Sequence, residues 1–202
     1  MARYTGPKAR INRRLGAMLF ESSGASRASD RRPNPPGMSL PRGRRSTYGQ
    51  SLAEKQKIKY YYGLGERQLR RLFDTARRQK GNTGSHLLEL CERRLDNVVR
   101  RAGFAASRPQ SRQGIAHGHF LVNGKRVDIP SYSVRPGDVI EVKNRGNLVE
   151  LYSALRAQQE TPMTDWLNVS DDSLSVTISR LPGPDDISLP VEVGMVIELL
   201  SR

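Results

Sequence analysis

The stretch Glu92-Arg93-Arg94-Leu95-Asp96-Asn97-Val98-Val99-Arg100-Arg101-Ala102-Gly103 decides the fold more than any other part of the chain. Its apolar residues recur every three or four positions, which is the period of a helix with one buried face. The inward face carries Leu95, Val98, Val99 and Ala102. The other faces carry Arg93, Arg94, Asn97, Arg100 and Arg101. Leu87 and Cys91 continue the apolar face upstream. We therefore predict one helix from Ser85 to about Ala102, with Cys91 in the core.

A second polar segment follows directly. Ser107 and Gln110 have the spacing of a capping box, and Pro109 is tolerated in a first turn, so a short helix is expected to about residue 116. Its polar side chains, with those at its exit, are Ser107, Arg108, Gln110, Ser111, Arg112, Gln113, His117 and His119. Two such helices side by side would form one positive surface. Its cations would neutralise phosphates, while amides and hydroxyls reach sugars and bases, including the 2′-hydroxyl of RNA. Two solvated basic helix faces are the alternative reading.

From residue 119 the pattern becomes that of strands. Residues 119–122 and 125–127 flank Asn123-Gly124, which is a strong hairpin signal. Further strands are expected at residues 139–142, 166–169 and 174–178, with a helix over 148–157, and the apolar residues 196–200 are expected to dock on a core. The predicted fold class is α+β, with a module of two helices packed on a small, mostly antiparallel sheet.

The part before this module is predicted to be helical, after an extended arm. A capping box at Ser51 and Glu54 predicts a helix to about Tyr62, and a second helix is expected over residues 66–79. Residues 21–47 are rich in Ser, Pro, Gly and Arg, so they should be extended or disordered without a partner, either as a linker or as an arm that folds onto RNA. The residue pattern thus predicts an extended arm, a helical domain and a compact module of two helices and a sheet.

The charge distribution favours a polyanionic partner. The net charge of the 202 residues is +14; the basic and acidic counts are 11 and 2 in residues 1–50, 9 and 4 in 51–91, 11 and 5 in 92–147, and 3 and 9 in 148–202. The nucleic-acid face is therefore expected in the first three quarters, while the acidic end suits packing or a basic protein. No apolar run approaches the roughly 20 residues of a membrane span. The start lacks the apolar segment of a signal peptide, and the single cysteine excludes an internal disulfide, so a cytoplasmic protein is expected.

Several motifs carry a resemblance to a known family. Residues 94–99, 107–113, 117–119 and 122–125, continued by 129–132 and 134–138, resemble the RNA-binding module named after ribosomal protein S-four. That module also occurs in other RNA-binding proteins. Residues 3–8, 13–16, 46–49, 52–57, 62–63 and 66–68 are similar to the start of the S-four family itself, in its bacterial type. The resemblance extends along nearly the whole chain. It implies a basic extended N-terminal arm (1–47), a helical domain (48–91, completed by about 181–202) and an RNA-binding module with additional strands (92–180).

The resemblance implies a structural constituent of the small ribosomal subunit. Such a protein would be a primary binder of small-subunit ribosomal RNA at a multi-helix junction, nucleating subunit assembly and supporting translation fidelity. It would contact neighbouring small-subunit proteins, including the fifth, and lie near the site where messenger RNA enters. Many members hold zinc on four N-terminal cysteines; this chain has none there, and Cys91 with three histidines cannot replace them, so a zinc-free member without cofactor is implied.

The RNA-binding residues expected on these grounds extend from the arm to the first hairpin. They are Arg3, Tyr4, Lys8, Arg13, Arg14, Arg44, Arg45, Lys55, Lys57, Arg67, Arg70, Arg93, Arg94, Asn97, Arg100, Arg101, Ser107, Arg108, Gln110, Ser111, Arg112, Gln113, His117, His119, Asn123 and Lys125. Within the module, six arginines (93, 94, 100, 101, 108 and 112) are expected to dock phosphates, and Asn97, Gln110, Gln113, His117 and Lys125 to refine the register.

Two other functions compete with this one. Some pseudouridine synthases carry the same module and use a catalytic aspartate after Arg-Leu, as in Arg94-Leu95-Asp96. Here Asp96 lies inside the module, where it is expected to orient a neighbouring arginine or cap a turn. No catalytic domain, nucleophile arrangement or phosphate-cradling glycine loop accompanies it, so we predict that the chain is not an enzyme. A free-standing regulatory RNA-binding protein would need only the module; the similar helical domain and arm argue against it.

Overall fold

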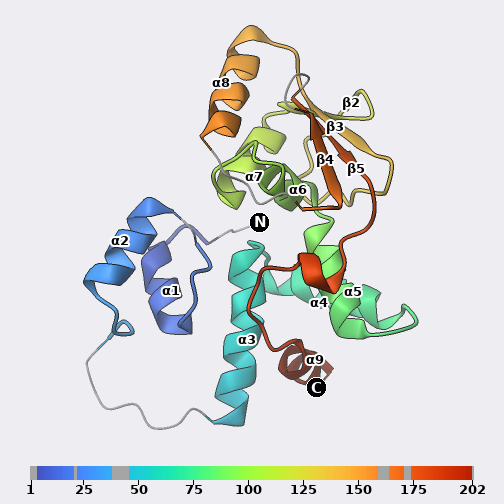
Figure 1. Cartoon of the computed structure of the whole chain (residues 1–202). Helices are drawn as coiled ribbons and strands as arrows, with labels where there is room; N and C mark the ends of the chain where they lie inside the picture. The colour runs from blue at the N-terminus through green and yellow to red at the C-terminus, as the bar shows by residue number, and fades with distance from the viewer. Residues whose placement is uncertain (1–3, 21, 38–45, 159–163, 171–173, 202) are drawn as a thin grey trace. The chain divides into compact units, whose positions relative to one another are not determined.

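The computed structural model describes residues 4–20, 22–37, 46–158, 164–170 and 174–201. The chain divides into two compact units (Figure 1). The first combines Met1–Leu87 with Ser188–Arg202, and the second is Leu88–Ile187. Within the described residues, no helix is both long enough and apolar enough to cross a bilayer.

The N-terminal segment of the first unit contains two short helices, α1 (Lys8–Leu15) and α2 (Ser23–Arg31). The prediction of an extended arm is wrong for these residues. Ile11, Leu15, Leu19 and Ala25 are buried, so the two helices share a small apolar contact that supplies what local propensity lacks. Asn12, which is 3% exposed, joins the loop after α1 to the helix: its Oδ1 accepts from the amides of residues 19 and 20, and its Nδ2 donates to the carbonyl of residue 20.

Helix α3 (Thr47–Tyr61) begins earlier than the sequence predicted. Ser46 is its N-cap, since Ser46 Oγ accepts from the amide of Gly49 at 3.2 Å. Ser51, the predicted cap, lies inside the helix, where its hydroxyl donates to the carbonyl of Thr47. The capping-box spacing therefore occurred by coincidence one turn into the helix.

The rest of this unit is formed by α4 (Glu66–Arg77), the start of α5 (Thr83–Glu92) and α9 (Val193–Ser201). Helix α9 packs beside α3 (Figure 1), and Val196 is fully buried as the sequence predicted. Gly84 makes the close approach of α5 to α9 possible, because a Cβ at Gly84 would lie 2.7 Å from Val193 Cγ1. The C-terminal residues thus complete the helical unit.

The predicted helix over 85–102 is in fact two helices. Helix α5 ends at Glu92, and α6 (Leu95–Arg101) starts after a break at Arg94, whose ψ of 136° is extended. The break is stabilised by residues 130–134: the amides of Leu95 and Asp96 donate to carbonyls 132 and 130, and the amide of Val134 donates to carbonyl 93. These backbone hydrogen bonds join segments that lie far apart in the sequence. The apolar residues of α5 and α6 keep one helical spacing across the break, so the sequence pattern does not reveal it.

The second unit is an α+β module, which confirms the predicted fold class. Its other elements are α7 (Arg108–Ala116), β1 (Phe120–Val122), β2 (Lys125–Arg126), β3 (Val139–Val142), α8 (Gly146–Ala157), β4 (Leu167–Ser170), β5 (Ser175–Ile178) and the 3₁₀ turn η1 (Pro184–Asp186). The sheet order is β2-β1-β3-β5-β4, and every pairing is antiparallel. The predicted hairpin is confirmed: Val122 pairs with Lys125 across Asn123 and Gly124, which have φ values of 51° and 74°.

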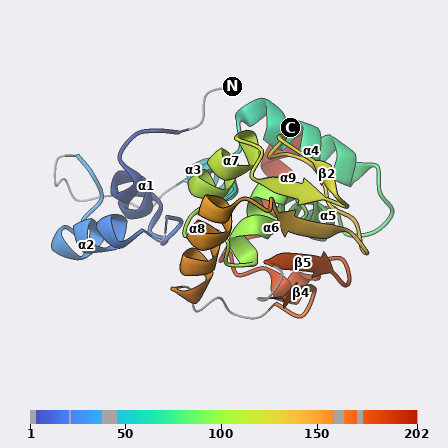
Figure 2. The ribbon, with the colours of Figure 1, turned by 90° about the horizontal axis from the view of Figure 1, so that it is seen from above.

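One apolar core holds the module together. It joins α6 and α7 to the sheet, with α8 alongside (Figure 2). Phe104, Phe120 and Trp166 are fully buried in it. Cys91 is also fully buried, which confirms its predicted core position. This packing fixes the direction in which the polar faces of α6 and α7 point.

Candidate nucleic-acid interface

Helices α6 and α7 pack against each other and are joined by polar contacts. Ser111, 1% exposed, donates from Oγ to the carbonyl of Asp96 at 2.6 Å. Gln110 Oε1 accepts from the amide of Ala106 at 2.9 Å. Ser107 is the N-cap residue but makes no side-chain cap bond, and Gln110 accepts from the residue before it, so the predicted capping box does not form.

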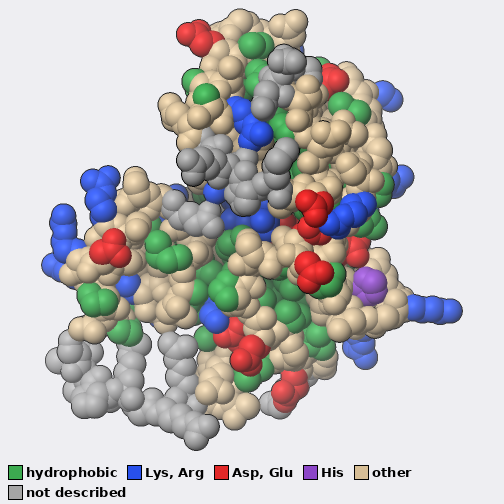
Figure 3. Space-filling view, in the orientation of Figure 1, with side chains coloured by type: hydrophobic (Ala, Val, Ile, Leu, Met, Phe, Trp, Pro, Cys, Tyr) green, Lys and Arg blue, Asp and Glu red, His purple; other side chains and the backbone are tan. Residues whose placement is uncertain are grey.

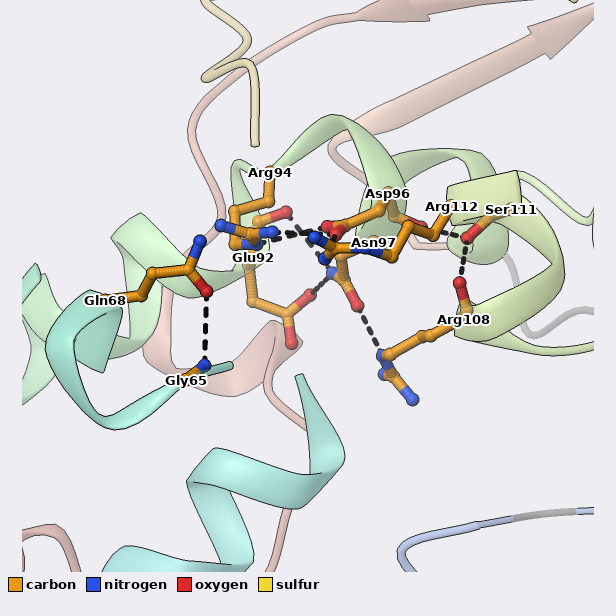
Figure 4. A network of polar contacts seen from close by, with 9 residues as sticks. All are labelled: Gly65, Gln68, Glu92, Arg94, Asp96, Asn97, Arg108, Ser111 and Arg112. Atoms are coloured by element: carbon orange, nitrogen blue, oxygen red, sulfur yellow. Dashed lines mark hydrogen bonds and ion pairs between the residues drawn. The ribbon is translucent and has the colours of Figure 1, made fainter. Parts of the chain in front are cut away.

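Asp96 binds Arg94, the N-cap residue of α6, and Arg112 of α7 (Figure 4). Arg94 binds it with both arms of its guanidinium, Nε to Oδ1 at 3.1 Å and Nη2 to Oδ2 at 2.7 Å. Arg112 Nη1 lies 3.3 Å from Oδ2. The predicted role of Asp96 in orienting an arginine is confirmed. Arg94, predicted to dock a phosphate, is only 4% exposed and turned onto Asp96, so it lies behind the surface rather than on it.

Glu92 forms a second buried centre, which sequence reasoning missed. It is 1% exposed and accepts from Arg101 Nη2 at 2.9 Å, from Arg101 Nε at 3.2 Å and from Asn97 Nδ2. Asn97 in turn accepts at Oδ1 from Arg108 Nε at 2.8 Å (Figure 4). The available signal was its position: Glu92 lies at helical spacing from Leu88 and Leu95, on the buried stripe.

The predicted residues of the module therefore lie at three depths. Arg94, Asn97 and Ser111 are buried. Partly buried are Arg93, Arg100, Arg101, Ser107, Arg108, Gln110, Arg112 and His119. Gln113, His117, Asn123 and Lys125 are exposed. Partners hold four of these arginines, Arg93, Arg101, Arg108 and Arg112, from behind; Arg93, for instance, donates to Glu89 and to the carbonyl of Val134.

Asn123 also serves the fold. Its Nδ2 donates to Asp138 Oδ1 at 2.9 Å, and its Oδ1 accepts from the amide of Val139 at 2.9 Å. Asp138 Oδ2 accepts from the amide of Arg135 as well. The side-chain amide of Asn123 thus links the hairpin turn to the start of β3 by hydrogen bonds.

His117 and His119 stand together at the exit of α7, with ring centroids 5.7 Å apart. His119 Nδ1 lies 2.9 Å from the hydroxyl of Tyr152. Burial, with the nearby His117 and Arg145, lowers the pKa of His119, and burial raises the pKa of Tyr152 to about 12.

Burial likewise raises the pKa of the Cys91 thiol well above its usual range. In the part of the chain that the structure describes, no three His, Cys, Asp or Glu side chains are grouped to hold a metal ion.

The first unit offers a less uniform surface. Tyr4 packs on Tyr60 with ring centroids 5.3 Å apart, and Lys8 Nζ lies 5.9 Å from the Phe20 ring centroid. Arg13 Nε donates to the carbonyl of Asn34. Arg14, Arg67 and Arg70 are exposed. Arg3, Arg44 and Arg45 lie outside the described residues.

Lys55 and Lys57, also predicted to bind RNA, are half-buried in ion pairs, Lys55 with Glu66 at 2.7 Å and Lys57 with Glu54 at 2.6 Å. The hydrogen bond from Lys55, opposed by burial and supported by Lys59, lowers the pKa of Glu66. On the face seen in Figure 3, Lys and Arg side chains project around α1 and α2, whereas acidic side chains lie over α9 and η1. The acidic C-terminal quarter is therefore represented at the surface of each unit.

Comparison with known proteins decides the family. Residues 3–92 match the model of the ribosomal protein S4/S9 N-terminal domain, and residues 93–140 match that of the S4 domain. The chain is 61% identical to the small ribosomal subunit protein uS4 of Rhodopirellula baltica, 46% to that of Thermoanaerobacter pseudethanolicus and 44% to that of Rubrobacter xylanophilus, each along the full length of both chains. The chain belongs to the uS4 family of small ribosomal subunit proteins.

Family membership confirms the resemblance inferred from the motifs. The uS4 proteins are structural, non-enzymatic components of the ribosome, so the chain is not an enzyme and its location is the cytoplasm. The matched S4 domain starts at residue 93, directly after the buried Glu92, and ends at residue 140 within β3. It thus includes α6, α7 and the hairpin but not the strands β4 and β5 that complete the sheet.

Proposed function

We propose that this chain binds small-subunit ribosomal RNA chiefly through the polar side of α6, α7 and the β1–β2 hairpin, called here the α6–α7 face. Its contact residues are Arg93, Arg100, Arg101, Ser107, Arg108, Gln110, Arg112, Gln113, His117, His119 and Lys125. Arg94, Asn97 and Ser111 support them from within, and the exposed Asn123 supports the hairpin turn through its bonds to Asp138 and Val139. The observation that carries the proposal is the pair of buried carboxylates, Glu92 and Asp96, which hold arginines of both helices from behind.

This arrangement suits phosphate recognition for two reasons. An arginine already fixed on one side loses less side-chain freedom when it meets a phosphate, so more of the interaction appears as affinity. Amide and imidazole groups between the arginines can reach sugars and base edges, including the 2′-hydroxyl that DNA lacks. A solubilising basic surface would not require arginines backed by buried acids.

The first unit would add a second set of contacts. Tyr4, Lys8, Arg13 and Arg14 surround α1, while Arg67 and Arg70 project from α4, and Arg3, Arg44 and Arg45 would join them. Binding through two units would favour RNA conformations that present both targets at once, and so would stabilise a junction that the free RNA samples only in part. On this basis the chain is a primary binder at a multi-helix junction that nucleates subunit assembly and supports translation fidelity.

The remaining partners follow from the family resemblance. They are neighbouring small-subunit proteins, including the fifth, and messenger RNA at the site where it enters. The acidic groups near α9 and η1 supply a chemical reason for basic protein neighbours.

The test is binding of the full chain to a small-subunit ribosomal RNA junction fragment, beside an unrelated structured RNA, across a salt series. For ~6–10 phosphate contacts, affinity should fall roughly 10³- to 10⁵-fold between about 50 and 200 mM salt. A preference for the junction that persists at the higher salt supports the proposal. Equal, steeply salt-dependent binding to both RNAs contradicts it.

A further inference from the structure

Glu92 is an unexpected residue to find behind a surface that attracts phosphate. A carboxylate opposes the approach of RNA, and a buried one also loses its hydration. Glu92 is 1% exposed, and the side chain of its partner Arg101 is 10% exposed. Ion pairing with Arg101 alone could be made at the surface at a smaller desolvation cost. Its burial beside Asn97 therefore points to a second task.

That task is visible in the hydrogen bonds of Asn97. A primary amide has a donating and an accepting end, and a half-turn of the side chain exchanges them. The carboxylate and the backbone carbonyl of Glu92 both accept from Asn97 Nδ2, the carbonyl at 3.2 Å, and neither can donate. Together they select the orientation in which Asn97 Nδ2 faces Glu92. The same orientation directs Asn97 Oδ1 toward Arg108 Nε, 2.8 Å away. In the opposite orientation, the amide would present a donor to the donor of Arg108.

We propose that Glu92 is a positioning residue for RNA binding: through the amide of Asn97 it aims Arg108, at the start of α7, toward the RNA backbone. This inference rests on the proposed function of the α6–α7 face. Figure 4 shows this sequence of contacts: Arg108 Nε faces Asn97, and the end of the Arg108 side chain beyond Nε points away from the other labelled residues. A Glu92 to Asn97 to Arg108 relay thus links the end of α5 to the first turn of α7.

The relay predicts an effect opposite in sign to simple electrostatics. Glu92→Gln removes one negative charge from a basic protein, which by itself should leave RNA binding unchanged or tighten it. The relay predicts weaker binding, because a glutamine side chain can donate or accept and so no longer favours one orientation of Asn97. Only the backbone carbonyl of residue 92 would still favour it, without the charge-assisted bond to the carboxylate. The expected loss is roughly tenfold, the worth of one charge-assisted hydrogen bond. The slope of log affinity against log salt should also fall, by up to about 0.9 for one lost phosphate contact.

The experiment measures binding of the full chain to the ribosomal RNA junction fragment across a salt series. Four proteins are compared: the wild type, Glu92→Gln, Arg108→Ala and the combined variant. If Glu92 acts through Arg108, Glu92→Gln adds little to the defect of Arg108→Ala, whereas general damage to the fold would add its full effect. Glu150→Gln, on the exposed side of α8, is the charge-matched control and should bind as the wild type does.

If the fluorescence of the buried Trp166 shows that Glu92→Gln does not fold, Asn97→Ser is the second test. Asn97→Ser removes the amide between Glu92 and Arg108 but leaves the Glu92–Arg101 pair in place. It should lower the affinity for RNA by the same factor in the wild type and should not lower it further in Arg108→Ala. Wild-type binding without preference for the junction, or an Arg108→Ala variant that binds normally, would contradict the proposed function itself. Normal or tighter binding by Glu92→Gln, with a clear defect in Arg108→Ala, overturns only the relay.

Discussion

Removal of the Asp96 carboxylate should destabilise the second unit more than any surface substitution there. Asp96 and Arg94 have side chains that are 6% and 5% exposed, and two hydrogen bonds of 3.1 and 2.7 Å join them. Asp96→Ala would leave the Arg94 guanidinium buried without its counter-ion. Breaking a buried pair on one side costs about 3–5 kcal/mol, whereas an exposed pair contributes about 0–1 kcal/mol. The low exposure of both side chains places this pair in the first class.

The assay is urea unfolding of the full chain, followed by tryptophan fluorescence. Trp166 is the only tryptophan and is fully buried in the second unit, so its signal reports that unit. With a denaturant slope of about 2 kcal/mol/M, the loss corresponds to a fall of roughly 1.5–2.5 M in the urea midpoint.

Two further variants complete this test. Glu150→Ala, which removes an exposed carboxylate from α8, should leave the midpoint nearly unchanged. Replacing both partners with apolar residues, Arg94→Met with Asp96→Leu, should cost less than Asp96→Ala alone. A midpoint for Asp96→Ala within about 0.5 M of the wild type would refute the reasoning that this pair is buried and mutually dependent.

Three other outcomes follow from individual side chains. Burial, with His117 and Arg145, lowers the pKa of His119, so the unfolded chain binds a proton at His119 more readily than the folded chain does. The contribution of His119 to the free energy of unfolding should therefore be fully present above the unfolded pKa of 6.5 and be lost as the pH falls below it. Urea titrations at pH 5.5 and 7.5 should show this loss in the wild type and a smaller loss in His119→Gln. A Cβ at Gly114 would lie 2.5 Å from the Tyr152 hydroxyl oxygen, so Gly114→Ala should destabilise the second unit by about 1–3 kcal/mol. Adding Tyr152→Phe should recover part of this loss. An equal loss from Gly114→Ala in the wild type and in Tyr152→Phe would argue against that contact. The buried Cys91 thiol, whose pKa is raised by burial, should react with a thiol reagent at pH 8 only in urea, and rapid labelling of the folded protein would contradict its core position.

Local patterns in the sequence predicted much of the second unit, because its decisive signals are short-range. Asn123-Gly124 between two strand-like segments indicated the hairpin, and the positive φ angles at both residues are what that turn requires. The spacing of Leu95, Val98 and Val99 indicated the buried face of α6. The break before α6 could not be seen in this way, since backbone bonds from residues 130–134 terminate one helix and start the next. The spacing of apolar residues in the sequence does not indicate such a contact.

The supporting residues of the interface were harder to predict than its surface. Arginines and amides of residues 93–113 stand out by composition, but their depth depends on tertiary packing, which buries Arg94 and leaves Gln113 exposed. Glu92 was missed because a single acidic residue among apolar ones gives no indication that its carboxylate is buried and binds several polar side chains. The helices of the N-terminal segment were missed for a related reason: α1 and α2, with buried Ile11 and Ala25, are stabilised by packing on each other across a loop rather than by their own helix propensity.

The most direct test of the central claim, that the α6–α7 face binds ribosomal RNA phosphates, is the salt dependence of two charge-matched variants. Arg108→Ala with Arg112→Ala removes two charges from this face, and Arg156→Ala with Arg180→Ala removes two from elsewhere in the same unit. On the junction fragment, the first variant should bind more weakly, and its slope of log affinity against log salt should be smaller by about 1.4–1.8. The second should keep the wild-type slope. Equal slopes and affinities for the two variants would contradict the claim and leave only the total charge of the protein to account for binding.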